Sequence, residues 1–306
     1  MVLPNLNLVA ITLTQLSAFL AVLRSGSVTA AADELVVTQP SVSSAVAALG
    51  RELGCDLFER AGRGIRPTDA GAAFAPFAVD VIGLLEAGRQ AAREAAAVDA
   101  RKLRIAAVTT AAESFVPPLM RSFSEGHEDV ELTLEVGNRE AVLERVLSHS
   151  VDVAFSGKPP ADPGLIAEPI ADNQIVCITA PNDPAVGPEP LGASDLERYR
   201  WLLREPGSGT RTLNEQYLTD NGLRPETLTM GSNGAIKQAA RAGLGISLLS
   251  RAAVQGELAA SLVAELTLKE PPATRPWFLL RAAAGPLRPT VRAFISFVLG
   301  TIEKTA

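Results

Sequence analysis

The strongest constraint on the fold is a connection of only two residues, Val36 and Val37, between two segments that both have helical character. Ser27 is a typical N-cap for the first segment, VTAAADEL, and Thr38 opens the second, TQPSVSSAVAALGRELG. Pro40 falls in the first turn of that second helix, where a missing N–H costs nothing. Because two residues cannot form a long loop, the two helices must meet in a tight turn.

A helix before this pair completes a three-helix unit. Residues 14–25 place Phe19 and several leucines at helical spacing, with Thr14 as the expected N-cap and Gly26 just past the end. In the third helix the expected buried stripe is Val42, Val46 and Leu49. The opposite, free face begins at Gln39 and carries Pro40, Ser43, Ser44 and Ala47. A tight turn followed by a helix with a small polar face is typical of a helix-turn-helix.

A basic segment, LFERAGRGIRPTDAG, follows the third helix, and its arginines recur at every third position between glycines. We predict a β-wing whose arginines touch DNA phosphates. Taken alone, the serines of the third helix could simply lie on a solvent-exposed helix face. Taken alone, the arginines could simply lie in a solvent-exposed loop. Their succession in this order favours DNA binding. The expected DNA contacts are Gln39, Pro40, Ser43, Ser44, Arg60, Arg63 and Arg66.

The composition is that of a folded globular chain, with 306 residues, 47% hydrophobic and 20% charged. A net charge of −6 taken alone argues against nucleic acid, but bases and acids balance over residues 1–68. Two distant cysteines, Cys55 and Cys177, fit neither a disulfide framework nor a metal site. The N-terminal residues lack the layout of a secretion signal, and no apolar run reaches 18 residues. We therefore expect a cytoplasmic protein with no metal, no cofactor and no membrane partner.

Residues 69–100 predict one long helix, capped by Thr68 or Asp69. Apolar or small residues recur with 3-4 spacing at positions 74, 77, 81, 84, 88, 91, 95 and 98. This spacing is typical of a coiled-coil seam. Pro76 should bend the helix in its first turns. A single amphipathic helix that packs on its own domain fits the periodicity as well.

From residue 103 onward, predicted strands alternate with predicted helices. The strands are LRIAAV, VELTLEV, VDVAF, IVCITA, WLLRE, TLTM, GISLLS and WFLLR, and a last helix runs from about Leu287 to Glu303. Such alternation is typical of an α/β fold with parallel strands.

The chain lacks the motifs of common enzymes. GxSxG, HExxH and GxxxxGK[ST] do not occur, and GSGT at 207–210 lacks the lysine of a phosphate-binding loop. The two histidines, His127 in a turn and His149 at a helix end, are expected to face solvent. We therefore do not expect an enzyme.

Hydroxyl and amide side chains recur directly before predicted helices, at Thr109 and Thr110, Ser208 and Thr210, and Ser232 and Asn233. Helix N-termini present free N–H groups and a positive dipole end, which favour anions. Each loop alone is equally well explained as a helix cap. Three such loops in one cleft would form an anion site.

The segment GSVTAAADELVVTQPSVSSAVAALGRELGCDLFERAGRGIRPTDAG resembles the winged helix-turn-helix of LysR-type transcriptional regulators. Many members carry Arg or Gln at the position of Ser44 and an acidic residue at that of Gly50. Without a forked side chain at Ser44, base readout there should be weaker and more water-mediated.

The resemblance implies a dimerising linker helix and a two-lobed effector domain similar to periplasmic binding proteins. The chain should cross between lobes near 172–175 and return near 276–279. The implied division is 1–68 (winged helix-turn-helix), 69–100 (coiled-coil linker) and 101–306 (effector domain, with lobe I at 101–173 and 280–306 and lobe II at 174–279).

The strings AAVTTAAE, LEVGNRE, REPGSGTR and GSNGAIKQAARAGLGIS are similar to the LysR branch that regulates carbon-fixation, nitrogen and cysteine-related genes. That branch often senses anionic metabolites, and Lys158, Arg139 and Arg211 could supply the counter-charge. The expected effector contacts are Thr109, Thr110, Lys158, Ser208, Thr210, Arg211 and Asn233.

The implied partners are double-stranded promoter DNA, a small anionic effector, and further copies of the chain in a homodimer that pairs into a homotetramer. The alternative is a two-lobed solute-binding protein of a transport system, which would need an export signal and no helix-turn-helix.

Overall fold

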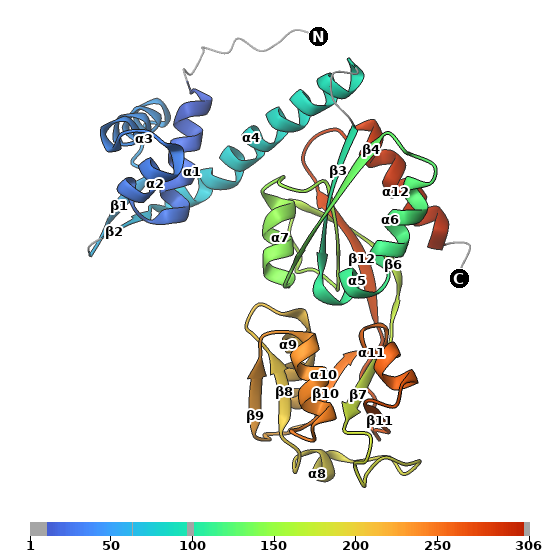
Figure 1. The fold of residues 1–306 in the computed structure, drawn as a ribbon. Coiled ribbons are helices and arrows are strands. Elements are labelled where there is room, and N and C mark those ends of the chain that lie inside the picture. The colour runs from blue at the N-terminus through green and yellow to red at the C-terminus, as the bar shows by residue number, and fades with distance from the viewer. Residues whose placement is uncertain (1–10, 63, 97–100, 303–306) are drawn as a thin grey trace. The chain divides into compact units, whose positions relative to one another are not determined.

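The computed structural model describes residues 11–62, 64–96 and 101–302, and the chain divides into two compact units, Met1–Ala95 and Ala96–Ala306. In the first unit, three helices precede a two-stranded antiparallel ribbon and a long helix (Figure 1). The elements are α1 (Leu13–Ser25), α2 (Val28–Leu35), α3 (Gln39–Leu53), β1 (Phe58–Ala61), β2 (Gly64–Pro67) and α4 (Asp69–Ala95).

Local sequence signals set the ends of the first three helices. The N-cap of α1 is Thr12, whose Oγ1 accepts from the N–H of Gln15 at 3.3 Å, while the Gln15 side chain accepts from the N–H of Thr12 at 2.7 Å. This reciprocal pair is a capping box, and it starts the helix before the expected cap Thr14. Gly26 ends α1 with φ 61°, a conformation that glycine adopts without strain. The caps of α2 and α3 are the expected residues, Ser27 and Thr38.

Phe19 on α1 joins the parts of the first unit. It is fully buried, and its ring centroid lies 5.3 Å from that of Phe58 on β1 and 5.6 Å from that of Phe74 on α4. Gly71 allows α4 to approach the chain before β1, because a Cβ at this position would collide with the carbonyl oxygen of Leu57. The wing is therefore anchored to α1 and α4 through one aromatic cluster.

The long helix α4 divides its apolar residues between two faces. Phe74 and Ala78 pack into the core of the first unit. We expected Phe74 in the coiled-coil seam, but the structure places it against this core instead. Phe77, Val81 and Leu85 follow at four-residue steps and are 67%, 49% and 44% exposed in the single chain. An exposed apolar row of this kind is typical of an interaction surface.

The helix continues through Pro76 without interruption. Val98, the last position of the expected seam, lies outside the described residues. By length and composition, α4 is the one helix in the described ranges that could cross a membrane, with a mean hydropathy of 1.5 over 18 residues. That stretch contains Asp80 and includes residues of the first unit's core, so these apolar residues already have a role in a folded domain.

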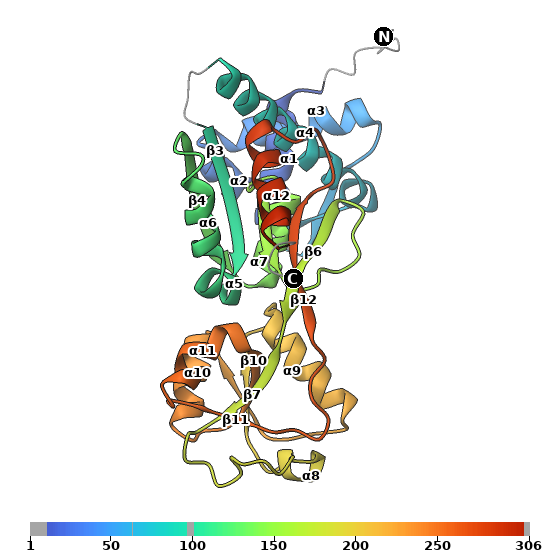
Figure 2. The ribbon, with the colours of Figure 1, turned by 90° about the vertical axis from the view of Figure 1, so that its right-hand side faces the viewer.

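The second unit has two lobes (Figure 2). The first is built on a five-stranded sheet in the order β4-β3-β5-β12-β6. Alternate residues of β3 face opposite sides of this sheet, so that Ile105 packs in the cluster with α6 and α12 and Ala106 packs in the cluster with α7. The elements are β3 (Arg101–Val108), α5 (Thr109–Ser114), α6 (Val116–Ser124), β4 (Val130–Gly137), α7 (Arg139–Leu147), β5 (Val153–Ser156), β6 (Leu165–Asn173), β12 (Arg275–Ala282) and α12 (Pro289–Ile302).

The second lobe contains a three-stranded sheet, β10-β7-β11, and a parallel pair, β8 and β9. Its elements are β7 (Ile175–Thr179), α8 (Ala193–Leu196), β8 (Trp201–Arg204), α9 (Gly209–Asp220), β9 (Thr227–Met230), α10 (Asn233–Arg241), β10 (Ser247–Ser250), α11 (Arg251–Ala259) and β11 (Ala264–Leu266). The parallel strands expected from the sequence include β3, β4 and β5, but β10, β11 and β12 pair antiparallel. The alternation of strands and helices did not reveal these antiparallel partners.

Strands β6 and β12 connect the lobes. They pair antiparallel from Leu165↔Ala282 to Asn173↔Arg275, and β7 of the second lobe starts at Ile175. The return segment thus enters the sheet at Arg275, earlier than the expected lobe boundary at 280.

A buried carboxylate ties three segments of the first lobe together. Asp152, before β5, lies 2.8 Å from Nη2 of Arg288, before α12, and 3.0 Å from Nη2 of Arg104, on β3. The backbone N–H of Arg104 also donates to Asp152 at 2.8 Å. The side chains of Asp152 and Arg288 are only 7% and 4% exposed, so each needs the other's charge.

We expect Asp152→Asn to lower the free energy of unfolding of the second unit by about 3 kcal/mol, because it removes the carboxylate that faces two guanidinium groups. Denaturant unfolding can be followed by tryptophan fluorescence, since both tryptophans, Trp201 and Trp277, lie in this unit. As a control, Glu125→Gln breaks an exposed pair with Arg121 and should cost less than about 0.5 kcal/mol. Equal effects of the two substitutions would contradict this account.

The same carboxylate predicts a pH dependence. Burial raises the pKa of Asp152, but the hydrogen bond from Arg104 and the charges of Arg288 and Arg104 outweigh it and lower the pKa below the ordinary 3.8. A lowered pKa in the folded state means that the stabilisation is complete above the unfolded pKa and is lost as the pH falls through the folded one. The stability difference between wild type and Asp152→Asn should therefore be constant above about pH 5 and shrink below about pH 4.

Candidate functional site

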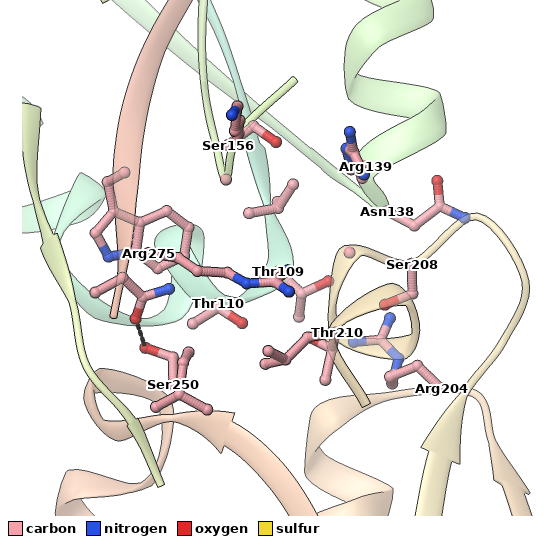
Figure 3. Close-up of a pocket in the computed structure, with 18 of the residues that line it drawn as sticks. Thr109, Thr110, Asn138, Arg139, Ser156, Arg204, Ser208, Thr210, Ser250 and Arg275 are labelled. Carbon is pink, nitrogen blue, oxygen red and sulfur yellow. Dashed lines mark hydrogen bonds between the residues drawn. The ribbon is translucent and has the colours of Figure 1, made fainter. Parts of the chain in front are cut away.

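A pocket lies between the two lobes of the second unit, where the loops leading into α5 and α7 face the loop leading into α9 (Figure 3). Its empty volume is about 730 Å³, part of which is open to solvent. The polar and charged residues that line it are Thr109, Thr110, Asn138, Arg139, Ser156, Lys158, Asn173, Arg204, Ser208, Thr210, Ser250 and Arg275.

The pocket carries uncompensated positive charge. No Asp or Glu lines it among the residues that the structure describes. Arg204 is neutralised by Glu205, which accepts from its Nε at 2.7 Å and from its Nη2 at 2.8 Å. Arg139, Lys158 and Arg275 form no ion pair with any described part of the chain. The charges of these three side chains therefore remain for a ligand.

Arg275 shows the effect of this imbalance. Burial lowers the pKa of Arg275, the charge of Arg139 lowers it further, and the charge of Asp220 raises it without cancelling the shift. Arginine keeps its proton at any physiological pH, so the lowered pKa reflects desolvation and repulsion and not a change of protonation. A bound anion would relieve both. Figure 3 shows Arg275 extending across the pocket toward Thr109.

Two buried polar atoms at this pocket have no hydrogen-bond partner among the residues that the structure describes. Ser156, at the end of β5, is fully buried, and neither its Oγ nor Nε of Arg139 has a hydrogen bond to any described residue. Buried polar atoms are nearly always paired with protein, water or a ligand. Ser208 precedes α9 without a side-chain capping bond, which leaves the first N–H groups of that helix available. The lining thus offers hydrogen-bond donors together with positive charge.

The structure brings most of the predicted effector contacts together. Those that line the pocket are Thr109, Thr110, Lys158, Ser208 and Thr210. Arg211 does not, because Nε pairs with Glu215 one turn along α9 at 2.8 Å and Nη1 donates to the carbonyl of Arg204 at 2.9 Å. Asn233 does not line it either, since its side chain is fully buried between Arg204 and Thr110.

Several lining residues were not among the expected contacts. Ser156 and Arg204 end strands β5 and β8, so the rule that ligands bind at the carboxyl ends of strands could have found them. Asn173 and Arg275 come from the crossing strands, and their approach depends on the β6–β12 register. Nothing local in the sequence marks those two residues.

The first unit presents the predicted DNA-binding face. On α3, Val42 and Leu49 are buried and Val46 is partly buried. The expected contacts Gln39, Pro40, Ser43 and Ser44 are exposed, as are Arg60 and Arg66 on the ribbon. Arg66 pairs with Glu59 at 2.7 Å, and Arg63 lies outside the described residues. An exposed polar helix beside a basic ribbon is the arrangement of a winged helix-turn-helix.

Comparison with known proteins places both units in one family. Residues 13–72 match the bacterial regulatory helix-turn-helix proteins of the lysR family, and residues 96–302 match the LysR substrate binding domain. The RuBisCO operon transcriptional regulator of Acidithiobacillus ferrooxidans is 33% identical over 288 residues, 94% of this chain and 93% of that protein. The HTH-type transcriptional regulator CbbR of Rhodospirillum rubrum is 36% identical over 287 residues, 94% of this chain and 95% of that protein.

A solved structure is also similar, the regulatory domain of CcmR from Synechocystis PCC6803 in complex with 2-PG. It has a TM-score of 0.63 and 30% identity, and the match covers 66% of this chain and 97% of that domain. The related proteins are named as regulators of transcription and not as enzymes. The chain therefore belongs to the LysR family and is a DNA-binding transcriptional regulator with an effector-binding α/β domain.

Proposed function

We propose that a small anionic metabolite binds in the interlobe pocket and controls how this regulator binds its promoter. The observation that carries this proposal is the set of three unpaired cations, Arg139, Lys158 and Arg275, in a pocket that no described carboxylate lines. Uncompensated charge at a partly buried site is costly unless a counter-ion binds. Binding across two lobes changes the angle between them, and the linker helix passes this change to the DNA-binding unit.

The chemistry of the pocket suits a ligand with a phosphate or a second acidic group. The similar CcmR domain was solved with 2-phosphoglycolate, which carries a phosphate and a carboxylate. In this chain, cations can balance two acidic groups while hydroxyls and helix N–H groups donate to their oxygens. The effector contacts that we propose are Thr109, Thr110, Arg139, Ser156, Lys158, Ser208, Thr210 and Arg275.

We propose that the three segments expected from the sequence have separate functions. Residues 1–68 bind promoter DNA in the cytoplasm, residues 69–100 dimerise, and residues 101–306 bind the effector. The exposed row of Phe77, Val81 and Leu85 supports dimerisation, since a second copy of α4 would cover it. Two dimers then pair into a tetramer. A solute-binding protein of a transport system, the alternative from another class, does not account for the lysR-type helix-turn-helix at residues 13–72.

We expect Arg275→Gln to weaken binding of 2-phosphoglycolate by about 30-fold, or about 2 kcal/mol, because it removes a charged donor from the pocket. Titration calorimetry on the full chain measures this. The matched control is Arg211→Gln, which lies outside the pocket and should change affinity by less than about twofold. If the control weakens binding as much as Arg275→Gln, the proposed site is wrong.

Each of Arg60→Ala and Arg66→Ala should weaken binding to all DNA sequences alike and reduce the slope of log K against log salt by about one unit. Fluorescence anisotropy over a range of salt concentrations gives the slope. Ser43→Ala should instead change the preference between operators and leave the slope unchanged. Wing variants with an unaltered slope would show that the ribbon does not touch phosphates.

Val81→Asp should convert the oligomer to a monomer, because it would bury a carboxylate against the partner helix. The single chain should keep its fold, since Val81 is 49% exposed within it. Light scattering gives the mass. Gln90→Glu places a carboxylate on the other side of α4 and serves as the control. An undiminished oligomer after Val81→Asp would count against this seam.

A further inference from the structure

Asn233 bridges the two lobes without touching the pocket. It is the first residue of α10 in the second lobe and is fully buried. Its Nδ2 donates at 2.8 Å to Oγ1 of Thr110, which lies on α5 in the first lobe, 123 positions away in the chain. Its Oδ1 accepts from Nη1 of Arg204 at 2.6 Å.

The direction of these hydrogen bonds is determined by chemistry. Arginine can only donate, so the atom of Asn233 that faces Arg204 must be its carbonyl oxygen. The amide nitrogen then faces Thr110, and an amide nitrogen can only donate. The Thr110 hydroxyl is therefore an acceptor in this bond, and its own proton must point elsewhere.

The proton of the Thr110 hydroxyl has no acceptor among the described residues. This hydroxyl donates to no acceptor within the described ranges, although Thr110 is only 7% exposed. Thr110 lines the pocket, so a ligand bound there can offer the missing acceptor. An anion in the pocket would accept this proton. Without the hydrogen bond from Asn233 the Thr110 hydroxyl would rotate, and its proton would often point away from the anion.

Arg204 holds Asn233 in this orientation. Two of its donor nitrogens, Nε and Nη2, are taken by Glu205, and the third, Nη1, is left for Asn233. The planar guanidinium therefore fixes the amide plane. Although Arg204 lines the pocket, its charge is already balanced by Glu205, so it orients donors while Arg275 and Arg139 supply charge.

We propose that Asn233 is a positioning residue that turns the Thr110 hydroxyl into an oriented donor for the anionic effector. Because Asn233 and Thr110 belong to different lobes, this donor is set only when the lobes adopt the arrangement seen here. Effector affinity is thereby tied to lobe closure. This inference rests on the proposed function, since it assumes an anion in the pocket.

The test is a double-mutant cycle of Asn233→Asp with Thr110→Val, measured by calorimetry on the full chain with 2-phosphoglycolate and with inorganic phosphate. Aspartate keeps the acceptor for Arg204 but cannot donate, so the Thr110 proton would turn toward it and away from the pocket. Its added charge also repels an anion, and this effect is the same in both backgrounds. We therefore expect Asn233→Asp to weaken binding about tenfold more in the wild-type background than in the Thr110→Val background.

Two further variants separate the outcomes. Thr110→Ser keeps the hydroxyl and should keep the dependence on Asn233. Asn221→Asp makes the same change in the second lobe outside the pocket lining, where the Asn221 side chain donates to the carbonyl of Tyr217, and should not change affinity. Tryptophan fluorescence confirms that each variant is folded.

A merely structural role for Asn233 would weaken binding by the same factor in both backgrounds, and that result would overturn the inference. If Arg275→Gln weakens binding while the cycle shows no coupling, the proposed function stands and only the role of Asn233 fails. If the wild-type chain binds neither probe, the proposed function fails and the inference falls with it.

Discussion

The pairing of β6 with β12 is the constraint on which the effector domain depends. Their register sets Asn173 opposite Arg275 at the mouth of the pocket, and the same two strands carry the chain between the lobes. Ser250 in the second lobe donates to Oδ1 of Asn173 at 2.6 Å, so that lobe is tied to the crossing as well. Because the pairing of β6 and β12 fixes the start of β12, Arg275 enters the pocket at a fixed position.

The charges of the domain fall into two groups with different roles. Asp152 pairs with both Arg104 and Arg288 inside the first lobe, where an unpaired charge would destabilise the fold. Arg139 and Arg275 are left close enough for one to lower the pKa of the other. Local arrangements that oppose stability persist at functional sites because binding compensates for them. The net charge of −6 therefore says nothing about this pocket, whose local charge is positive.

Much of the fold could be predicted from the sequence because it rests on local interactions. Ser27, Thr38 and Gly26 mark helix ends through bonds to residues within one turn, and the structure confirms all three. The N-terminal ends of α5 and α9 were predicted in the same way, since hydroxyl residues at the start of a helix are a local signal; Ser208 precedes α9, whereas Thr109 is the first residue of α5. A local signal of this kind does not determine the direction in which a side chain points. Arg211 lies in the first turn of α9, next to the pocket residue Thr210, yet its pairing with Glu215 along the helix turns it away from the pocket.

The sequence by itself therefore determined most of the elements, the polar face of α3 and the family to which the chain is similar, but it did not reveal β6, α11 or β11. Only the tertiary structure decided which side chains share the pocket, because Arg275 and Asn233 reach their partners from distant parts of the chain. Asn233 and Thr110 are separated by 123 positions, and no periodicity or cap connects them. Contacts at such separations follow from strand register and from how the lobes pack, and neither is encoded in a short stretch of residues.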